Sequence, residues 1–168
     1  MAVKTIEDLF IHELSDIYSA EKQLTKALPR LARAATAPEL KKAFETHLEE
    51  TQGQVERIDQ IVEALGIRLK RIKCAAMEGL VEEGKEVIEE VEAGALRDAA
   101  LIGGAQKVEH YEIASYGTLS AIAKQLGYQD ALPLLQATLK EEKATDEKLT
   151  MLAEQAGNQR AAEKSKAA

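Results

Sequence analysis

The sequence predicts an all-α protein, and three observations support that prediction. Residues typical of helices (Ala, Leu, Glu and Lys) abound, whereas aromatic residues make up only 4% of the chain and Trp is absent. Hydrophobic residues amount to 45%, which is enough to form a core within one domain of 168 residues. Apolar residues recur at intervals of three and four, as on the buried face of an amphipathic helix.

Residues that start and stop helices divide this pattern into four long helices, expected at about 5–35, 37–65, 96–126 and 130–156. Thr5 with Asp8 can cap the first helix, and Thr36 with Glu39 forms a capping-box sequence before the second. Glycines 66 and 127 follow two of the periodic segments and suit left-handed helix ends. The short connections predict two antiparallel hairpins.

Residues 66–95 link the two hairpins and contain a shorter amphipathic pattern, so we expect a long crossover with a short helix in it. The predicted architecture is therefore a four-helix bundle of two antiparallel hairpins over residues 1–156. Residues 157–168 form a polar tail that we expect to be disordered. Gly103 and Gly104 lie inside the third long helix, where we expect them to permit close packing, for instance of the crossover helix.

Charge and cysteine content exclude several classes of protein. Asp and Glu total 29 against 22 Lys and Arg, and the net charge of −7 without a long basic run argues against nucleic-acid binding. Cys74 is the single cysteine, so we expect neither an intrachain disulfide nor a thiolate metal site. With no identifiable base nearby, we expect its thiol to be an unreactive one, either buried or in a linker. No apolar run matches a secretory signal or a membrane span, which predicts a cytoplasmic protein with no membrane partner.

Polar residues interrupt the apolar face of every long helix near its middle. They are Glu21 in the first helix, His47, Glu50 and Gln54 in the second, Glu109 and Glu112 in the third, and Glu142 and Asp146 in the fourth. Buried carboxylates that face one another are unfavourable unless they are protonated or a cation lies between them. Because no Lys or Arg occupies these faces, a pair of divalent or trivalent cations is the natural counter-charge.

The register of the hairpins brings these residues into one layer. In an antiparallel hairpin, residues equally distant from the turn lie side by side. About the first turn, Glu21 falls opposite the segment between Glu50 and Gln54, and about the second turn Glu112 falls opposite Glu142. At ~1.5 Å of rise per residue, the members of each pair lie within about one helical turn of each other. The register therefore predicts a metal site in the middle of the bundle.

Two segments suggest that the halves of the chain repeat each other. THLEETQGQ (46–54) aligns with TLKEEKATD (138–146), which places Glu50 over Glu142 and Gln54 over Asp146. This repeat predicts a pseudo-two-fold site with one carboxylate from each helix. Within the third helix the apolar spacing favours Glu109 as a ligand, whereas the register favours Glu112, and both can contribute.

His47 and Tyr116 have two interpretations each. His47 is either a metal ligand or a residue that orients Glu50 or Gln54. Tyr116 lies on the apolar face of the third helix, and we expect it to pack in the core rather than to take part in redox chemistry.

These features resemble the ferritin-like superfamily of dinuclear carboxylate proteins. Five segments resemble, more narrowly, the bacterial YciF-like stress-protein family: KTIEDLFIHELSDIYSAEKQL (4–24), HLEETQGQVERID (47–59), KCAAMEGL (73–80), AQKVEHYEIASYGTL (105–119) and LKEEKATDEKL (139–149). The resemblance covers residues 4–155. It implies a ferritin-like bundle, a homodimer, a dinuclear iron or manganese centre and a role in the stress response, but it does not supply a reaction.

The sequence departs from the superfamily's Glu-x-x-His pattern, because Gly53 and Thr145 stand where the ligand histidines would be. An oxygen-rich set of ligands favours manganese or iron(III) over softer ions. If the protein is an enzyme, we expect oxidation of Fe(II) or removal of peroxide. The alternatives are a non-enzymatic structural or interaction protein with a vestigial metal site, and a subunit of an iron-storage cage.

Overall fold

The structure is a computed structural model of the 168-residue chain and describes residues 3–154 and 162–163. Within these residues it contains five helices and no strand: α1 (Ile6–Ala34), α2 (Pro38–Leu65), α3 (Ala75–Glu90), α4 (Ala95–Leu126) and α5 (Leu132–Leu152). The predicted all-α class is therefore confirmed. The predicted tail at 157–168 lies outside the described residues, apart from 162–163. None of the described helices combines the length and apolarity needed to cross a membrane.

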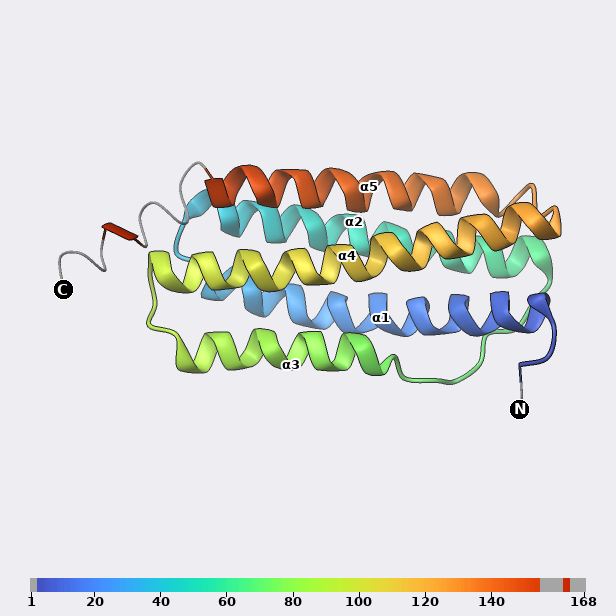
Figure 1. The fold of residues 1–168 in the computed structure, drawn as a ribbon, viewed down its shortest axis with the longest axis horizontal. Helices are drawn as coiled ribbons and strands as arrows, with labels where there is room; N and C mark the ends of the chain where they lie inside the picture. The colour runs from blue at the N-terminus through green and yellow to red at the C-terminus, as the bar shows by residue number, and fades with distance from the viewer. Residues whose placement is uncertain (1–2, 155–161, 164–168) are drawn as a thin grey trace.

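The four long helices pack side by side (Figure 1). Helix α1 packs against α2, and α4 against α5, with further contacts between α1 and α4 and between α2 and α5. Helix α3 lies against α1 and α4 on the outside of this group. Because the linker and α3 carry the chain back along the length of the molecule, α2 and α4 run in the same direction (Figure 1).

Three of the predicted helix ends are confirmed. The Thr5 side chain accepts a hydrogen bond from the backbone of Asp8, and the Asp8 carboxylate accepts from the backbone of Thr5, which is a complete capping box. Gly66 (φ 61°) and Gly127 (φ 71°) end α2 and α4 in the left-handed region, where glycine avoids the clash of a Cβ atom.

The predicted cap of α2 is wrong. The N-cap residue is Ala37, and the Thr36 side chain does not cap the helix. The carboxylate of Asp98, in the first turn of α4, instead accepts the backbone N–H groups of Thr36 at 2.7 Å and Ala37 at 2.8 Å. A carboxylate makes stronger hydrogen bonds to these groups than a neutral hydroxyl does. Asp98 thereby ties the α1–α2 turn to the start of α4.

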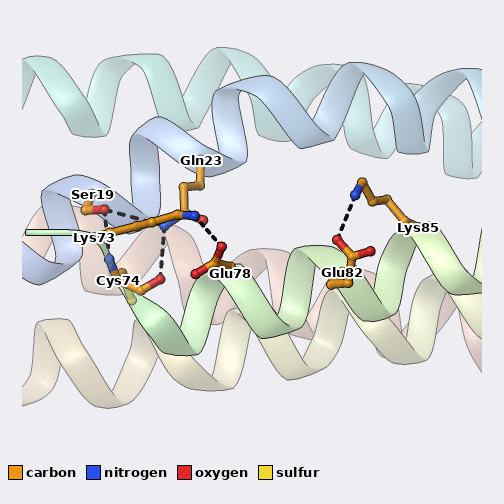
Figure 2. A network of polar contacts seen from close by, with 7 residues as sticks. All are labelled: Ser19, Gln23, Lys73, Cys74, Glu78, Glu82 and Lys85. Atoms are coloured by element: carbon orange, nitrogen blue, oxygen red, sulfur yellow. Dashed lines mark hydrogen bonds and ion pairs between the residues drawn. The ribbon is translucent and has the colours of Figure 1, made fainter.

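A network of polar contacts, the α3 junction, anchors the start of α3 (Figure 2). The backbone N–H of Cys74 donates to the Ser19 hydroxyl at 2.9 Å, and the Gln23 side chain donates to the Cys74 carbonyl at 3.1 Å. Lys73 and Glu78 form an ion pair beside them on the surface. Cys74 is buried and is the N-cap residue of α3, as expected for a structural thiol.

The expected close packing at Gly103 and Gly104 is not found. A Cβ atom added at either position would meet no heavy atom within 4 Å. This part of α4 instead borders a cavity of about 230 Å³ between α1, α3 and α4. Helix α3 therefore contacts α4 without closing onto its glycines.

Candidate metal centre

Six of the eight predicted site residues are buried in one layer between the four long helices, which we call the polar layer. Their exposed fractions are at most 4%, and they are Glu21, His47, Gln54, Glu109, Glu112 and Glu142. They come from α1, α2, α4 and α5. Apolar residues are buried on either side of the layer along each long helix.

Four of these residues form the tightest group. One potential ligand atom from each of His47, Glu109, Glu112 and Glu142 lies within 4.8 Å of the corresponding atoms of the others. His47 Nε2 is 3.6 Å from Glu109 Oε1. Glu109 and Glu112 lie three residues apart on α4 and therefore share a face of that helix. Both glutamates thus belong to the group. The apolar spacing, which favoured Glu109, and the hairpin register, which favoured Glu112, each identified one of them.

Glu21 adjoins this group from α1. The Tyr116 hydroxyl donates a hydrogen bond to Glu21 Oε1, and Glu21 Oε2 has no hydrogen-bond partner. Tyr116 is buried, as predicted, but it also belongs to the polar layer, which was not predicted. Its position four residues after Glu112, on the same helix face, was the available signal.

Gln54 connects the layer to an ion pair that sequence reasoning missed. Its side-chain nitrogen donates to Glu141 Oε2 at 3.2 Å, while Gln54 Oε1 has no partner. Arg57 makes two hydrogen bonds to Glu141, at 2.6 and 2.5 Å, and a third to Thr138 at 3.1 Å. Arg57 follows Gln54 by three residues and Glu141 precedes Glu142, so both adjoin predicted ligands in the sequence. The pair fixes α2 against α5 beside the layer.

The other two predicted residues lie at the edge of the layer. Glu50 is half-buried and accepts a hydrogen bond from the Thr145 hydroxyl at 3.4 Å. Asp146 is 22% exposed and pairs with His110, whose Nε2 atom is 3.3 Å from Asp146 Oδ2.

The predicted symmetry of the site is therefore not observed. Helix α2 contributes the buried His47 and Gln54, while its carboxylate, Glu50, lies outside the tight group. His47 and Gln54 are seven residues apart, or about two helical turns, and lie on nearly the same line along the helix. Glu50 is rotated by about 60° from His47 about the helix axis.

Burial dominates the electrostatics of the carboxylates. It raises the pKa values of Glu21, Glu109 and Glu112 well above their usual range, and repulsion from Glu142 raises them further. Burial also raises the pKa of Glu142, to about 7. Without a counter-ion, these residues retain protons at pH values where exposed glutamates are ionised.

His47 is shifted in the opposite direction. Burial, followed by the nearby charge of Lys148, lowers its pKa to about 4. The imidazole is therefore neutral at physiological pH, which is the form that binds metals.

The polar atoms of the layer fit a bound cation. Several buried polar atoms have no hydrogen-bond partner: Glu21 Oε2, both nitrogens of His47, Gln54 Oε1, Glu109 Oε2, and both carboxylate oxygens of Glu112 and Glu142. Unsatisfied buried groups of this kind are costly in a folded protein. Carboxylate and amide oxygens and a neutral imidazole are all groups that bind metal ions in proteins. The residues present could therefore hold a metal ion.

The chain is similar to proteins of one known family. The family described as "Domain of unknown function (DUF892)" matches residues 5–162. Protein YciF of Escherichia coli (strain K12) is 66% identical over 154 residues, which cover 91% of this chain and 93% of that protein.

Solved structures resemble most of the chain. The crystal structure of the E. coli stress protein YciF matches with a TM-score of 0.87 at 66% identity, over 89% of this chain and 95% of that one. YcfI from Rhodopseudomonas palustris matches with a TM-score of 0.85 at 47% identity, over 88% and 94%. A Xanthomonas campestris protein at 24% identity, with a TM-score of 0.71 over 89% and 92%, is similar in fold alone. The chain therefore belongs to the DUF892 family and is similar to the stress protein YciF, as its sequence motifs predict.

Proposed function

We propose that this chain is a ferritin-like stress-associated protein whose polar layer binds a pair of iron or manganese ions. The unpartnered buried atoms of the layer carry the proposal, because polar side chains from four helices gather there with several oxygens and nitrogens that lack a hydrogen-bond partner. The ions would be held by His47, Glu109, Glu112 and Glu142, with Glu21 and Gln54 completing the set and Glu50 and Asp146 at its edge.

The arrangement of the helices supports the ferritin-like part of the proposal. Two hairpins, α1–α2 and α4–α5, are joined by a connection that returns along the length of the molecule (Figure 1). Ferritin-like bundles have one long crossover of this kind and bind metals between facing helices. We assign α1, α2, α4 and α5 to such a bundle, with α3 in the crossover.

Bound iron or manganese would supply one-electron redox chemistry, which suits the oxidation of Fe(II) or the removal of peroxide. The surrounding residues position the ligands for that role. Tyr116 holds Glu21 through its hydroxyl, and Glu141, itself held by Arg57, orients Gln54. Partners of this kind fix the orientation of metal ligands.

Metal analysis of matched variants tests the proposal. Protein purified without chelator and then supplied with Mn(II) or Fe(II) should retain metal after desalting, whereas Glu142→Gln should retain about tenfold less. Glu147→Gln is the control, because Glu147 is exposed on the same helix. Elemental analysis by mass spectrometry provides the measurement. Wild-type protein that cannot be loaded with either ion would overturn the proposal.

A second candidate function is a non-enzymatic structural or interaction protein with a vestigial metal site. The carboxyl pairs Glu21–Glu112 and Glu109–Glu142 favour it, because each pair is close enough to share a proton in the absence of metal. In that case Mn(II) should leave the melting temperature unchanged. A rise in melting temperature that is lost in Glu142→Gln would exclude it.

We also propose that the protein is a cytoplasmic homodimer. Exposed apolar side chains gather at the start of the chain, where Val3, Ile6 and Leu9 are 43%, 40% and 36% exposed. A second copy of the chain could cover this patch. Light scattering should give twice the chain mass of 18.3 kDa, and Leu9→Glu should shift the protein toward the monomer. A monomeric wild-type protein or a large shell would contradict this proposal.

A further inference from the structure

A chamber of about 120 Å³ adjoins the polar layer on the side of the α1–α2 turn. All four long helices contribute to its walls. The apolar lining includes Leu28, Ala43, Phe44, Ala105, Val108 and Leu149.

One wall of the chamber is polar and belongs to the polar layer. It is formed by His47 and Glu109, which are 4% and 2% exposed. Both ring nitrogens of His47 and the Oε2 atom of Glu109 have no hydrogen-bond partner. The chamber thus combines an apolar body with unpartnered polar atoms at a single wall.

The mouth of the chamber lies between α2 and α5. Thr46, Glu50, Thr145 and Lys148 line it, and none of them is fully buried. The hydrogen bond from Thr145 to Glu50 joins the two helices here. A molecule that enters between them reaches the His47–Glu109 wall without passing α3, which packs on the opposite pair of helices, α1 and α4.

We propose that this chamber binds a small, uncharged, predominantly apolar molecule next to the centre in the polar layer. The proposal rests on the proposed metal-binding function for the role of that centre, but the binding itself does not require the metal. A cavity of about 150 Å³ with apolar walls binds benzene or xenon, so this chamber suits molecules of that size or smaller. A charged molecule would lose hydration against the apolar body of the chamber, which offers it no partner there.

Ligand binding to the metal-free protein tests the chamber itself. Benzene and xenon serve as probes, followed by NMR chemical shifts of methyl groups in the lining. The wild type should show saturable shifts. Ala43→Leu replaces a methyl with an isobutyl group on the chamber wall and should weaken binding at least about tenfold.

The matched control is Ala100→Leu. Ala100 lines the cavity of about 230 Å³ between α1, α3 and α4 and not the chamber, so this substitution should leave binding at the chamber unchanged. The smaller change Ala43→Val, which is easier to accommodate, should weaken binding in the same direction as Ala43→Leu. Loss of binding in Ala100→Leu but not at position 43 would place the ligand in the other cavity and overturn the proposal. The absence of saturable binding to the wild type would overturn it as well.

Metal content measured on the same samples separates this proposal from the proposed function. Wild-type protein that retains Mn(II) but binds neither probe overturns the chamber alone. Protein that binds the probes but cannot be loaded with metal overturns the proposed function and leaves a binding site without a reaction. Full loading of Ala43→Leu with Mn(II), together with weakened probe binding, supports both.

Discussion

The polar layer and the α3 junction are both polar clusters that join several segments of the chain, yet their hydrogen bonding is opposite. At the junction, the Cys74 N–H and carbonyl groups each meet a complementary side chain, from Ser19 and Gln23 (Figure 2). In the polar layer, buried oxygens and nitrogens of His47, Glu112 and other residues have no partner. The hydrogen bonds of the junction are all made within the protein, whereas the carboxyl groups of the layer need protons or a cation to balance them.

The difference follows from the residue types at the two places. The junction combines backbone donors with a hydroxyl and an amide, which can both donate and accept. The layer collects carboxylates, which only accept when they are ionised, around a neutral imidazole. A cluster of ionised carboxylates cannot supply the donors that its own oxygens need. We therefore read the junction as structural and the layer as a site for a ligand.

The largest expected effect concerns pH and the polar layer. The pKa of Glu142 rises from 4.5 to about 7 on folding, so the stability it contributes is complete below about pH 4.5 and is lost as the pH rises toward 7. As the pH rises to about 7, the free energy of unfolding of the metal-free protein should fall by about 3 kcal/mol because of this group. The raised pKa values of Glu21, Glu109 and Glu112 act in the same direction.

Mn(II) should reduce this loss, because a bound cation favours the ionised carboxylates. Urea unfolding at about pH 5 and about pH 7, with and without Mn(II), measures the difference. Glu142→Gln should reduce the pH dependence of the free energy of unfolding of the metal-free protein. The exposed control Glu147→Gln should leave that pH dependence unchanged. An identical pH profile with and without Mn(II) would count against a ligand-dependent layer.

An intermediate effect is expected at the α3 junction. Ser19→Ala removes the acceptor of the Cys74 N–H group and should lower the free energy of unfolding by about 2 kcal/mol. The loss should be the same with and without Mn(II), because the junction is complete without a metal. Ser115→Ala is the control, since its hydroxyl donates only to the Tyr111 carbonyl of its own helix. A loss that appeared only in the metal-loaded protein would break the distinction between the two clusters.

The smallest effect is expected at the surface of the junction. Lys73 and Glu78 form an ion pair, but their side chains are 65% and 54% exposed. Exposed pairs of this kind contribute little, so Glu78→Gln should change the free energy of unfolding by less than about 0.5 kcal/mol. Glu82→Gln, which breaks the neighbouring exposed pair with Lys85, is the matched comparison (Figure 2). A loss comparable to that of Ser19→Ala would show that the surface pair, rather than the buried hydrogen bonds, holds α3 in place.

Much of this protein could be predicted from its sequence. The helix ends at Thr5, Gly66 and Gly127 are local, because capping depends on residues within a turn of the helix terminus. The burial of Glu21 and Glu142 was predictable from helical periodicity, since each occupies an apolar face. Local periodicity could not predict the cap of α2, because Asp98 reaches it from a distant part of the chain.

By itself, then, the sequence determined the five helices and the set of polar residues that interrupt their apolar faces. Only the tertiary structure decided which members of that set meet. The helical repeat defines a face to within several tens of degrees, whereas partners depend on how neighbouring helices rotate and pack. That rotation brings His47 into the polar layer and leaves Glu50 at its edge, links Tyr116 to Glu21, and opens the chamber beside them.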